Sequence, residues 1–268
     1  MNTRSSLMAV AAAALLAAGA LVWYLQRAAT PSPPAEVTPA ARAPVAPAAS
    51  AASEAHYPLP AEAALPPLRS DEVAGAVGEL LGGGRGAALV FTDDFVHRLA
   101  ATVDNLGRDY APAMLWPVRP TGGRFTVEQA DGRTVIAGAN SARYAPFVRL
   151  VERVDAAAAV KLYWRMEPLL QAAYRELGFP KGFFNDRLVH VIDLLLATPQ
   201  PSHPIQVQLV DVKGPVPSTR PWVRYEFVDA NLQSLAAGQK ILLRVGPENE
   251  RRLKAKLRAV RALLTATS

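Results

Sequence analysis

The sequence predicts an α+β protein: a helix-rich single domain with a small antiparallel β component, placed behind an N-terminal transmembrane helix and a disordered linker. Three observations predict this layout. Residues 7–25 are uninterruptedly apolar, residues 28–68 are rich in Pro and Ala, and residues 69–268 carry mostly helical spacing of apolar side chains. A few short alternating segments within the last range account for the β component.

Residues 7–25, LMAVAAAALLAAGALVWYL, are expected to form a transmembrane signal anchor. At 1.5 Å per residue the run makes a helix of about 28 Å, close to the ~30 Å hydrocarbon core of a bilayer. Trp23 and Tyr24 fit the aromatic belt at one interface. The small residues Ala18-Gly19-Ala20 leave a cleaved signal peptide open as the alternative.

The flanking charges do not set the orientation of the anchor in the membrane, because they nearly balance: Arg4 lies on one side, and Arg27 and Arg42 lie on the other. A short N-terminal flank, residues 1–6, is normally cytoplasmic. We therefore expect a single-pass protein of the bacterial inner membrane with its C-terminal domain in the periplasm. The chain has no Cys, so disulfides, thiol chemistry and lipidation of a cysteine are excluded.

Residues 28–68 contain no stretch that could bury a core, and we expect a disordered Pro/Ala-rich linker. As a flexible coil it would average roughly 35 Å from end to end. A spacer that lifts the domain from the membrane is favoured over a Pro-rich ligand for another domain.

The soluble domain, residues 69–268, is predicted to begin with two helices. Ser70 is the expected N-cap of the first, which the glycines at 82–84 end. Thr92 is the expected N-cap of the second, with Asp93 and Asp94 in its first turn.

Residues 125–129 and 134–137 are predicted to pair as a hairpin, because Asp131-Gly132 supplies the positive φ angles of a tight turn. Helices are then expected over 144–154 and 156–177, with a kink at Pro168.

Asn185 is the expected N-cap of the next helix, which is so apolar through residue 196 that a central position is predicted. Alternation predicts strands over 205–212 and 223–227. Two helices should follow, over 229–245 and 247–264, the second opened by Gly246-Pro247.

Two segments resemble a known family. They are GFFNDRLVHVIDLLLATP at 182–199 and AGQKILLRVGPENERRLKAKLRAVRALL at 237–264. They are similar to a bacterial membrane-anchored family catalogued as domain of unknown function 3014, and the likeness covers most of residues 69–264. The resemblance implies a shared fold and topology. That family has no assigned activity, so it carries over no catalytic residue.

The net charge of +6 is concentrated at the C-terminal end of the domain, in residues 239–268. On the last helix an apolar stripe, Leu253, Leu257, Val260 and Leu264, lies opposite cations, which predicts a basic surface. This surface could meet an acidic envelope protein, anionic lipid or a cell-wall polymer. Alternatively, the cations only complement helix dipoles and aid solubility. The candidate binding residues are Lys240, Arg244, Arg251, Lys254 and Arg258.

Nucleic acid is not an expected partner, since the domain is expected outside the cytoplasm and the basic region lacks aromatic residues for base stacking. No hydrolase, nucleotide-binding or metalloprotease motif is present. No cofactor or metal is expected. Asp93 and His97, spaced i and i+4, are too few for a closed metal site.

A second candidate site is polar and lies at the start of the apolar helix: Asn185, Asp186, Arg187 and His190. Asp186, His190 and Asp193 stand at i, i+4 and i+7, so one helix face could orient a general base. The plainer interpretation is that these residues form the single solvated strip of that helix.

We therefore expect a membrane-anchored envelope protein that binds a partner or scaffolds an assembly. The alternative is an envelope hydrolase with an unrecognised active site near Asn185 and His190. Without a catalytic motif, the binding role is favoured over the enzymatic one.

Overall fold

The computed structural model describes residues 54–60, 66–211 and 220–266. The predicted flank, the anchor at 7–25 and most of the linker lie outside these ranges. Within them, none of the helices combines the length and the hydropathy that crossing a bilayer requires.

The domain is rich in helices and carries two small antiparallel sheets, which confirms the helix-rich α+β prediction. Short 3₁₀ turns occupy Ala113–Leu115 and Pro221–Val223. The helices are α2 (Val73–Leu80), α3 (Gly84–Ala87), α4 (Phe95–Leu106), α5 (Asn140–Arg153), α6 (Ala156–Glu176), α7 (Phe184–Leu196), α8 (Ala230–Gln233), α9 (Ala237–Arg244) and α10 (Pro247–Leu264). The strands are β1 (Val127–Ala130), β2 (Arg133–Ile136), β3 (Val207–Leu209) and β4 (Tyr225–Phe227).

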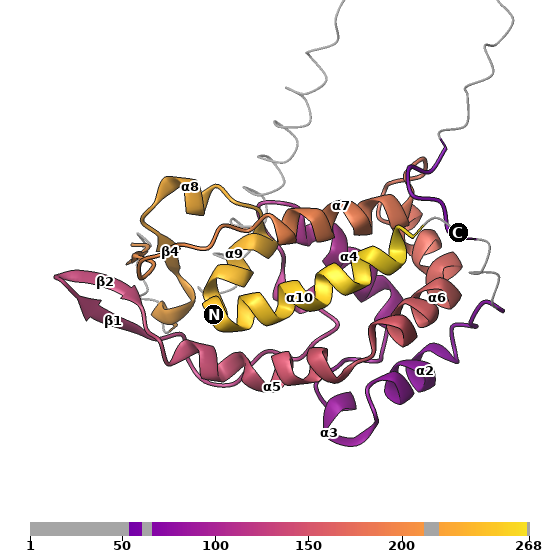
Figure 1. The fold of residues 1–268 in the computed structure, drawn as a ribbon, viewed down its shortest axis with the longest axis horizontal. Coiled ribbons are helices and arrows are strands. Elements are labelled where there is room, and N and C mark those ends of the chain that lie inside the picture. Colours follow the sequence, from indigo (N-terminus) through magenta and orange to yellow (C-terminus); the bar gives the residue numbers. More distant parts are fainter. Residues whose placement is uncertain (1–53, 61–65, 212–219, 267–268) are drawn as a thin grey trace, which may run out of the picture. The chain divides into compact units, whose positions relative to one another are not determined.

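Helix α10 lies at the centre of the helical part. It contacts α5, α6, α7 and α9, and in Figure 1 it crosses the middle of the view between α7 and α5. The main core gathers side chains from several of these helices, and its largest fully buried side chains include Val148, Leu170, Phe184 and Val189. The predicted central position of the apolar helix, α7, is confirmed by its contacts with α4, α6, α9 and α10.

The β elements lie at one end of the domain (Figure 1). In the β1–β2 hairpin Val127 pairs with Ile136, and the turn residues Asp131 and Gly132 have φ of 51° and 71°. This confirms the predicted tight turn. Strands β3 and β4 pair antiparallel as a second sheet, and a hydrogen bond from Ile136 N to Ile205 O (3.0 Å) joins the two sheets.

Several helices begin or end a few residues away from the predicted positions. The N-cap position of α2 is Glu72 rather than Ser70, and the Glu72 carboxylate accepts a bond from Arg69 N at 2.9 Å. That of α4 is Asp94 rather than Thr92. The helix predicted over 229–245 is divided into α8 and α9.

Asn185 is not the N-cap of α7. The helix begins at Phe184 with Phe183 in the N-cap position, two residues before the predicted cap, and the Phe184 N–H donates to the Gln171 side chain of α6 at 2.8 Å. Gln171 also donates to Gly182 O at 2.8 Å. A neighbouring helix therefore supplies the polar group that a local cap would have provided.

The folded unit extends further toward the N-terminus than residue 69. Leu68 is 6% exposed and donates its N–H to Arg165 O at 2.9 Å. Tyr57 and Leu59 pack against the main core. Part of the segment predicted as linker, residues 54–60 and 66–68, thus belongs to the compact domain.

Candidate functional site

The polar residues at the start of α7 face in different directions. Asn185 is 4% exposed, accepts the Tyr163 hydroxyl at 2.8 Å and donates to Tyr57 O at 2.7 Å. The Asp186 carboxylate accepts the backbone N–H groups of His56 (3.0 Å) and Tyr57 (2.7 Å). These two side chains therefore hold the N-terminal segment of the domain.

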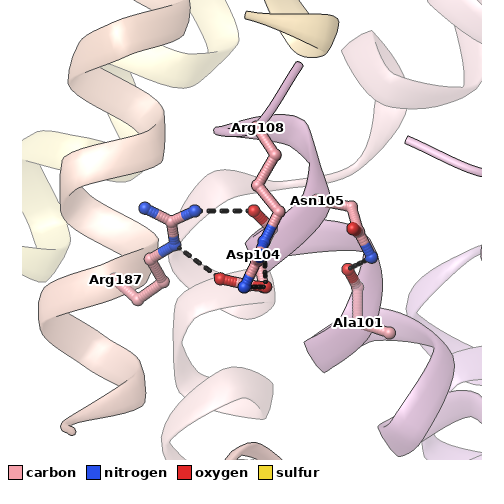
Figure 2. Close-up of polar contacts among 5 residues, drawn as sticks. All are labelled: Ala101, Asp104, Asn105, Arg108 and Arg187. Atoms are coloured by element: carbon pink, nitrogen blue, oxygen red, sulfur yellow. Dashed lines mark hydrogen bonds and ion pairs between the residues drawn. The ribbon is translucent and has the colours of Figure 1, made fainter. Parts of the chain in front are cut away.

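Arg187 instead joins α7 to the end of α4 (Figure 2). Its Nε donates to the Asp104 carboxylate at 3.0 Å and its Nη2 to the Asp104 carbonyl at 2.6 Å. Arg108 donates to the same carboxylate at 2.7 Å. Asp104 is 6% exposed, so two guanidinium groups neutralise a buried carboxylate. The cluster of Asp104, Arg108 and Arg187 therefore has a structural role, which is to hold α7 against the end of α4.

His190 is exposed, and within the described ranges it has no hydrogen-bond or ion-pair partner. Asp193, one turn further on, pairs with Arg261 of α10. The row of Asp186, His190 and Asp193 therefore does not converge on one site. Across the residues that the structure describes, no group of three His, Cys, Asp or Glu side chains could hold a metal ion.

Lys254 does not belong to an exposed basic surface, contrary to the sequence prediction. It is 3% exposed, its Nζ lies 2.7 Å from Glu250 Oε1, and it donates to Thr198 O at 2.5 Å. The helical periodicity identified one apolar stripe, but α10 is covered by helices on more than one side. A cation on the flank of the stripe is consequently buried with a carboxylate.

Most other cations of α10 bind neighbouring helices. Arg252 pairs with Glu152, and Lys256 donates to the carbonyls of Glu152 (3.1 Å) and Val154 (2.6 Å) at the end of α5. Of the candidate binding residues on this helix, Arg251 and Arg258 remain exposed. Arg251 pairs with Glu248 one turn away.

The two candidate residues on α9 have different surroundings. Lys240 donates to Gln233 O at 3.3 Å. Arg244 donates to Lys240 O (3.3 Å) and Tyr225 O (3.2 Å), and its guanidinium lies 4.4 Å from the centroid of the Phe227 ring. Burial lowers the pKa of Arg244, while Tyr144 and Glu226 act in the opposite direction. The cation is thus held in a poorly solvated position.

Arg244 lines a pocket of about 290 Å³ between the sheets and the start of α5. Arg143 contributes a second guanidinium, which donates to Gly122 O (3.0 Å), Gly123 O (3.3 Å) and the Asn140 side chain (3.2 Å). We call this the arginine–aromatic pocket. Its lining consists of Gly123, Phe125, Arg143, Tyr144, Trp222, Val223, Tyr225 and Arg244.

Neither arginine of the pocket forms an ion pair with a carboxylate of the described residues. Arg124 adds a third guanidinium beside the pocket, 4.2 Å from the Trp222 ring centroid. Sequence reasoning identified only Arg244 here. The other members come from distant parts of the chain, and their one local signal was the adjacency of an Arg and an aromatic residue at Arg124-Phe125 and Arg143-Tyr144.

His97 pairs with Asp94 and Glu176 rather than with Asp93. Its Nδ1 lies 2.6 Å from Asp94 Oδ1 and its Nε2 lies 3.1 Å from Glu176 Oε2. The hydrogen bond to Asp94, helped by Glu176, raises the pKa of His97 against a smaller opposing effect of burial. The cluster is exposed and bridges α4 to α6.

A family model described as "Protein of unknown function (DUF3014)" matches residues 95–261. No curated protein and no solved structure matches the chain.

Proposed function

We propose that this chain, which belongs to the DUF3014 family of proteins of unknown function, is a membrane-anchored envelope protein whose domain binds an anionic partner. The apolar run at 7–25 and the Pro-rich linker support a single-pass anchor in the bacterial inner membrane, with the domain in the periplasm. In this proposal the domain is a binding or scaffolding module, and the arginine–aromatic pocket is its contact site.

The observation that carries the proposal is that Arg143 and Arg244 form no ion pair with a carboxylate of the described residues, although the more distant Glu226 carboxylate acts on Arg244. Their donors in the described residues go to backbone carbonyls and one amide, which satisfies hydrogen bonds but leaves the two positive charges without a paired carboxylate. A carboxylate or phosphate entering the pocket would gain charge-assisted hydrogen bonds, which guanidinium groups favour.

The size and lining of the pocket favour one partner class over the others considered. At about 290 Å³ it lies at the small end of ligand sites, so it suits one acidic group carried by a larger molecule. Tyr144, Trp222 and Tyr225 would bury the apolar part of such a group. An acidic envelope protein or an anionic cell-wall polymer fits this concave shape better than a flat lipid surface.

In-cell crosslinking of the full-length protein, followed by affinity purification and mass spectrometry, tests the proposal. The test variant combines Arg124→Glu with Arg143→Gln. The control combines Arg251→Glu with Arg258→Gln, which changes the charge equally on the exposed face of α10. Recovery of the partner should fall at least tenfold in the test variant, because interfacial charge contacts contribute about 1.5–3 kcal/mol each.

Equal recovery of the partner with both double variants would refute the pocket as the contact site. Loss only in the α10 variant would move the site to Arg251 and Arg258. If the wild-type protein captures no partner, the binding proposal fails, and the domain should instead be screened for hydrolase substrates.

A further inference from the structure

Residues 54–60, EAHYPLP, lie along the first turn of α7 as a strip outside any helix or strand, and the chain bends at His56 and Tyr57. Ala55, Tyr57 and Leu59 are turned toward the domain, whereas Glu54, His56 and Pro58 are exposed. Tyr57 and Leu59 pack against the main core, so the strip has one side committed to the domain.

The domain binds this strip through its backbone. The Asp186 carboxylate accepts two consecutive N–H groups, those of His56 and Tyr57, and Asn185 donates to the carbonyl of Tyr57. Every peptide offers such groups unless a proline removes the N–H. Because one carboxylate accepts two consecutive N–H groups, the two side chains recognise a main chain that bends at this point, and selectivity rests with the side chains at 57 and 59.

Asn185 is held in the orientation that this recognition requires. The Tyr163 hydroxyl donates to Asn185 Oδ1, which leaves Asn185 Nδ2 directed at Tyr57 O. Tyr163 is 8% exposed, and burial raises its pKa, so its hydroxyl stays a donor. The site is thus built from groups fixed by the core of the domain.

The strip also suits release and rebinding. Pro58 and Pro60 restrict the backbone conformations of the released strip, which lowers the entropy lost on docking. Among the described residues, three hydrogen bonds and the packed side chains of Tyr57 and Leu59 hold the strip, a small contact beside the main core. Segments with few buried contacts open at lower free energy than the domain unfolds.

We infer that Asn185 and Asp186 form a peptide-binding site, and that residues 54–60 occupy it as a releasable latch of the chain itself. Its ligand class is a peptide that bends at an aromatic residue, with free N–H groups on that residue and on the residue before it, followed by Pro and an aliphatic side chain. Release lengthens the chain ahead of the domain by about 20 Å. This inference is independent of the arginine–aromatic pocket.

Hydrogen exchange on the full-length protein, followed by mass spectrometry, tests the docked state. In the wild type the amides of His56 and Tyr57, which donate to Asp186, should be protected. In Asp186→Ala their exchange should accelerate roughly tenfold to a hundredfold, since two bonds to a charged acceptor are lost. His190→Ala, on the same helix and exposed, is the control and should leave the exchange unchanged.

A peptide of sequence EAHYPLP, labelled with a fluorophore, tests the site from outside. It should bind full-length protein carrying Tyr57→Ser and Leu59→Ser at least tenfold more tightly than wild type, whose site is filled. Adding Asp186→Ala should abolish that gain. Equal exchange in Asp186→Ala and wild type, or peptide binding that ignores Asp186, would overturn the inference.

Discussion

Replacing Lys254 with Met should destabilise the domain strongly, although the side chain keeps its length and apolar stem. Glu250 and Lys254 have side-chain exposures of 3% and 4%. Removing the cation leaves the carboxylate buried without a partner and takes the donor from Thr198 O. Breaking a buried ion pair from one side costs about 3–5 kcal/mol, a large part of the 5–15 kcal/mol that stabilises a typical domain.

Thermal unfolding followed by circular dichroism measures this loss. For a domain of this size, about 3–5 kcal/mol corresponds to a melting temperature roughly 6–20 °C lower. Adding Glu250→Leu to Lys254→Met should restore most of the stability, because an apolar pair can replace a buried ion pair at little cost. Arg258→Met, on the exposed side of the same helix, should shift unfolding by no more than about 0.5 kcal/mol.

Two results would refute this reasoning. If Lys254→Met unfolds like Arg258→Met, then Glu250 is not held as an unpaired ion in the variant. If the double variant is no more stable than Lys254→Met alone, then the loss does not come from the orphaned Glu250 carboxylate.

Two further predictions concern α4, α6 and α9. Asp94 and Glu176 raise the pKa of His97, so the His97 side chain should contribute its full stabilisation below pH about 6.5 and lose it as pH rises through the folded-state pKa. The difference in free energy of unfolding between wild type and His97→Gln, measured in denaturant titrations, should therefore shrink from pH 5.5 to pH 9. Gly238→Ala would place a Cβ 3.0 Å from Leu106 O, and should lower the free energy of unfolding by about 1–3 kcal/mol in the same assay.

Elements set by local chemistry were predictable from the sequence. The Asp131-Gly132 turn fixed the first hairpin, because only residues that tolerate positive φ serve there. The long apolar helices were also predictable from period alone. Asn185 shows the limit of local sequence patterns. It resembles an N-cap residue, but the acceptor for the first N–H of α7 is Gln171, which lies in another helix and outside the sequence neighbourhood of the cap.

The sites were less predictable than the elements, for the same reason. Lys254 and Arg258 are one helical turn apart, and the pattern alone treats them alike. Packing of four other helices against α10 buries Lys254 and leaves Arg258 exposed. Arg143 and Trp222 join one pocket only through tertiary structure, so no spacing in the sequence could associate them.

The central position of α10 has a consequence for how the domain is made. A ribosome produces the chain from the N-terminus, at about 5–20 residues per second, and α10 is the last of the described helices to emerge. Until then the apolar faces of α5, α6 and α7 lack the helix that covers them. The domain should therefore complete its folding only after residue 264 is synthesised, and the nascent chain should be a client for chaperones during that interval.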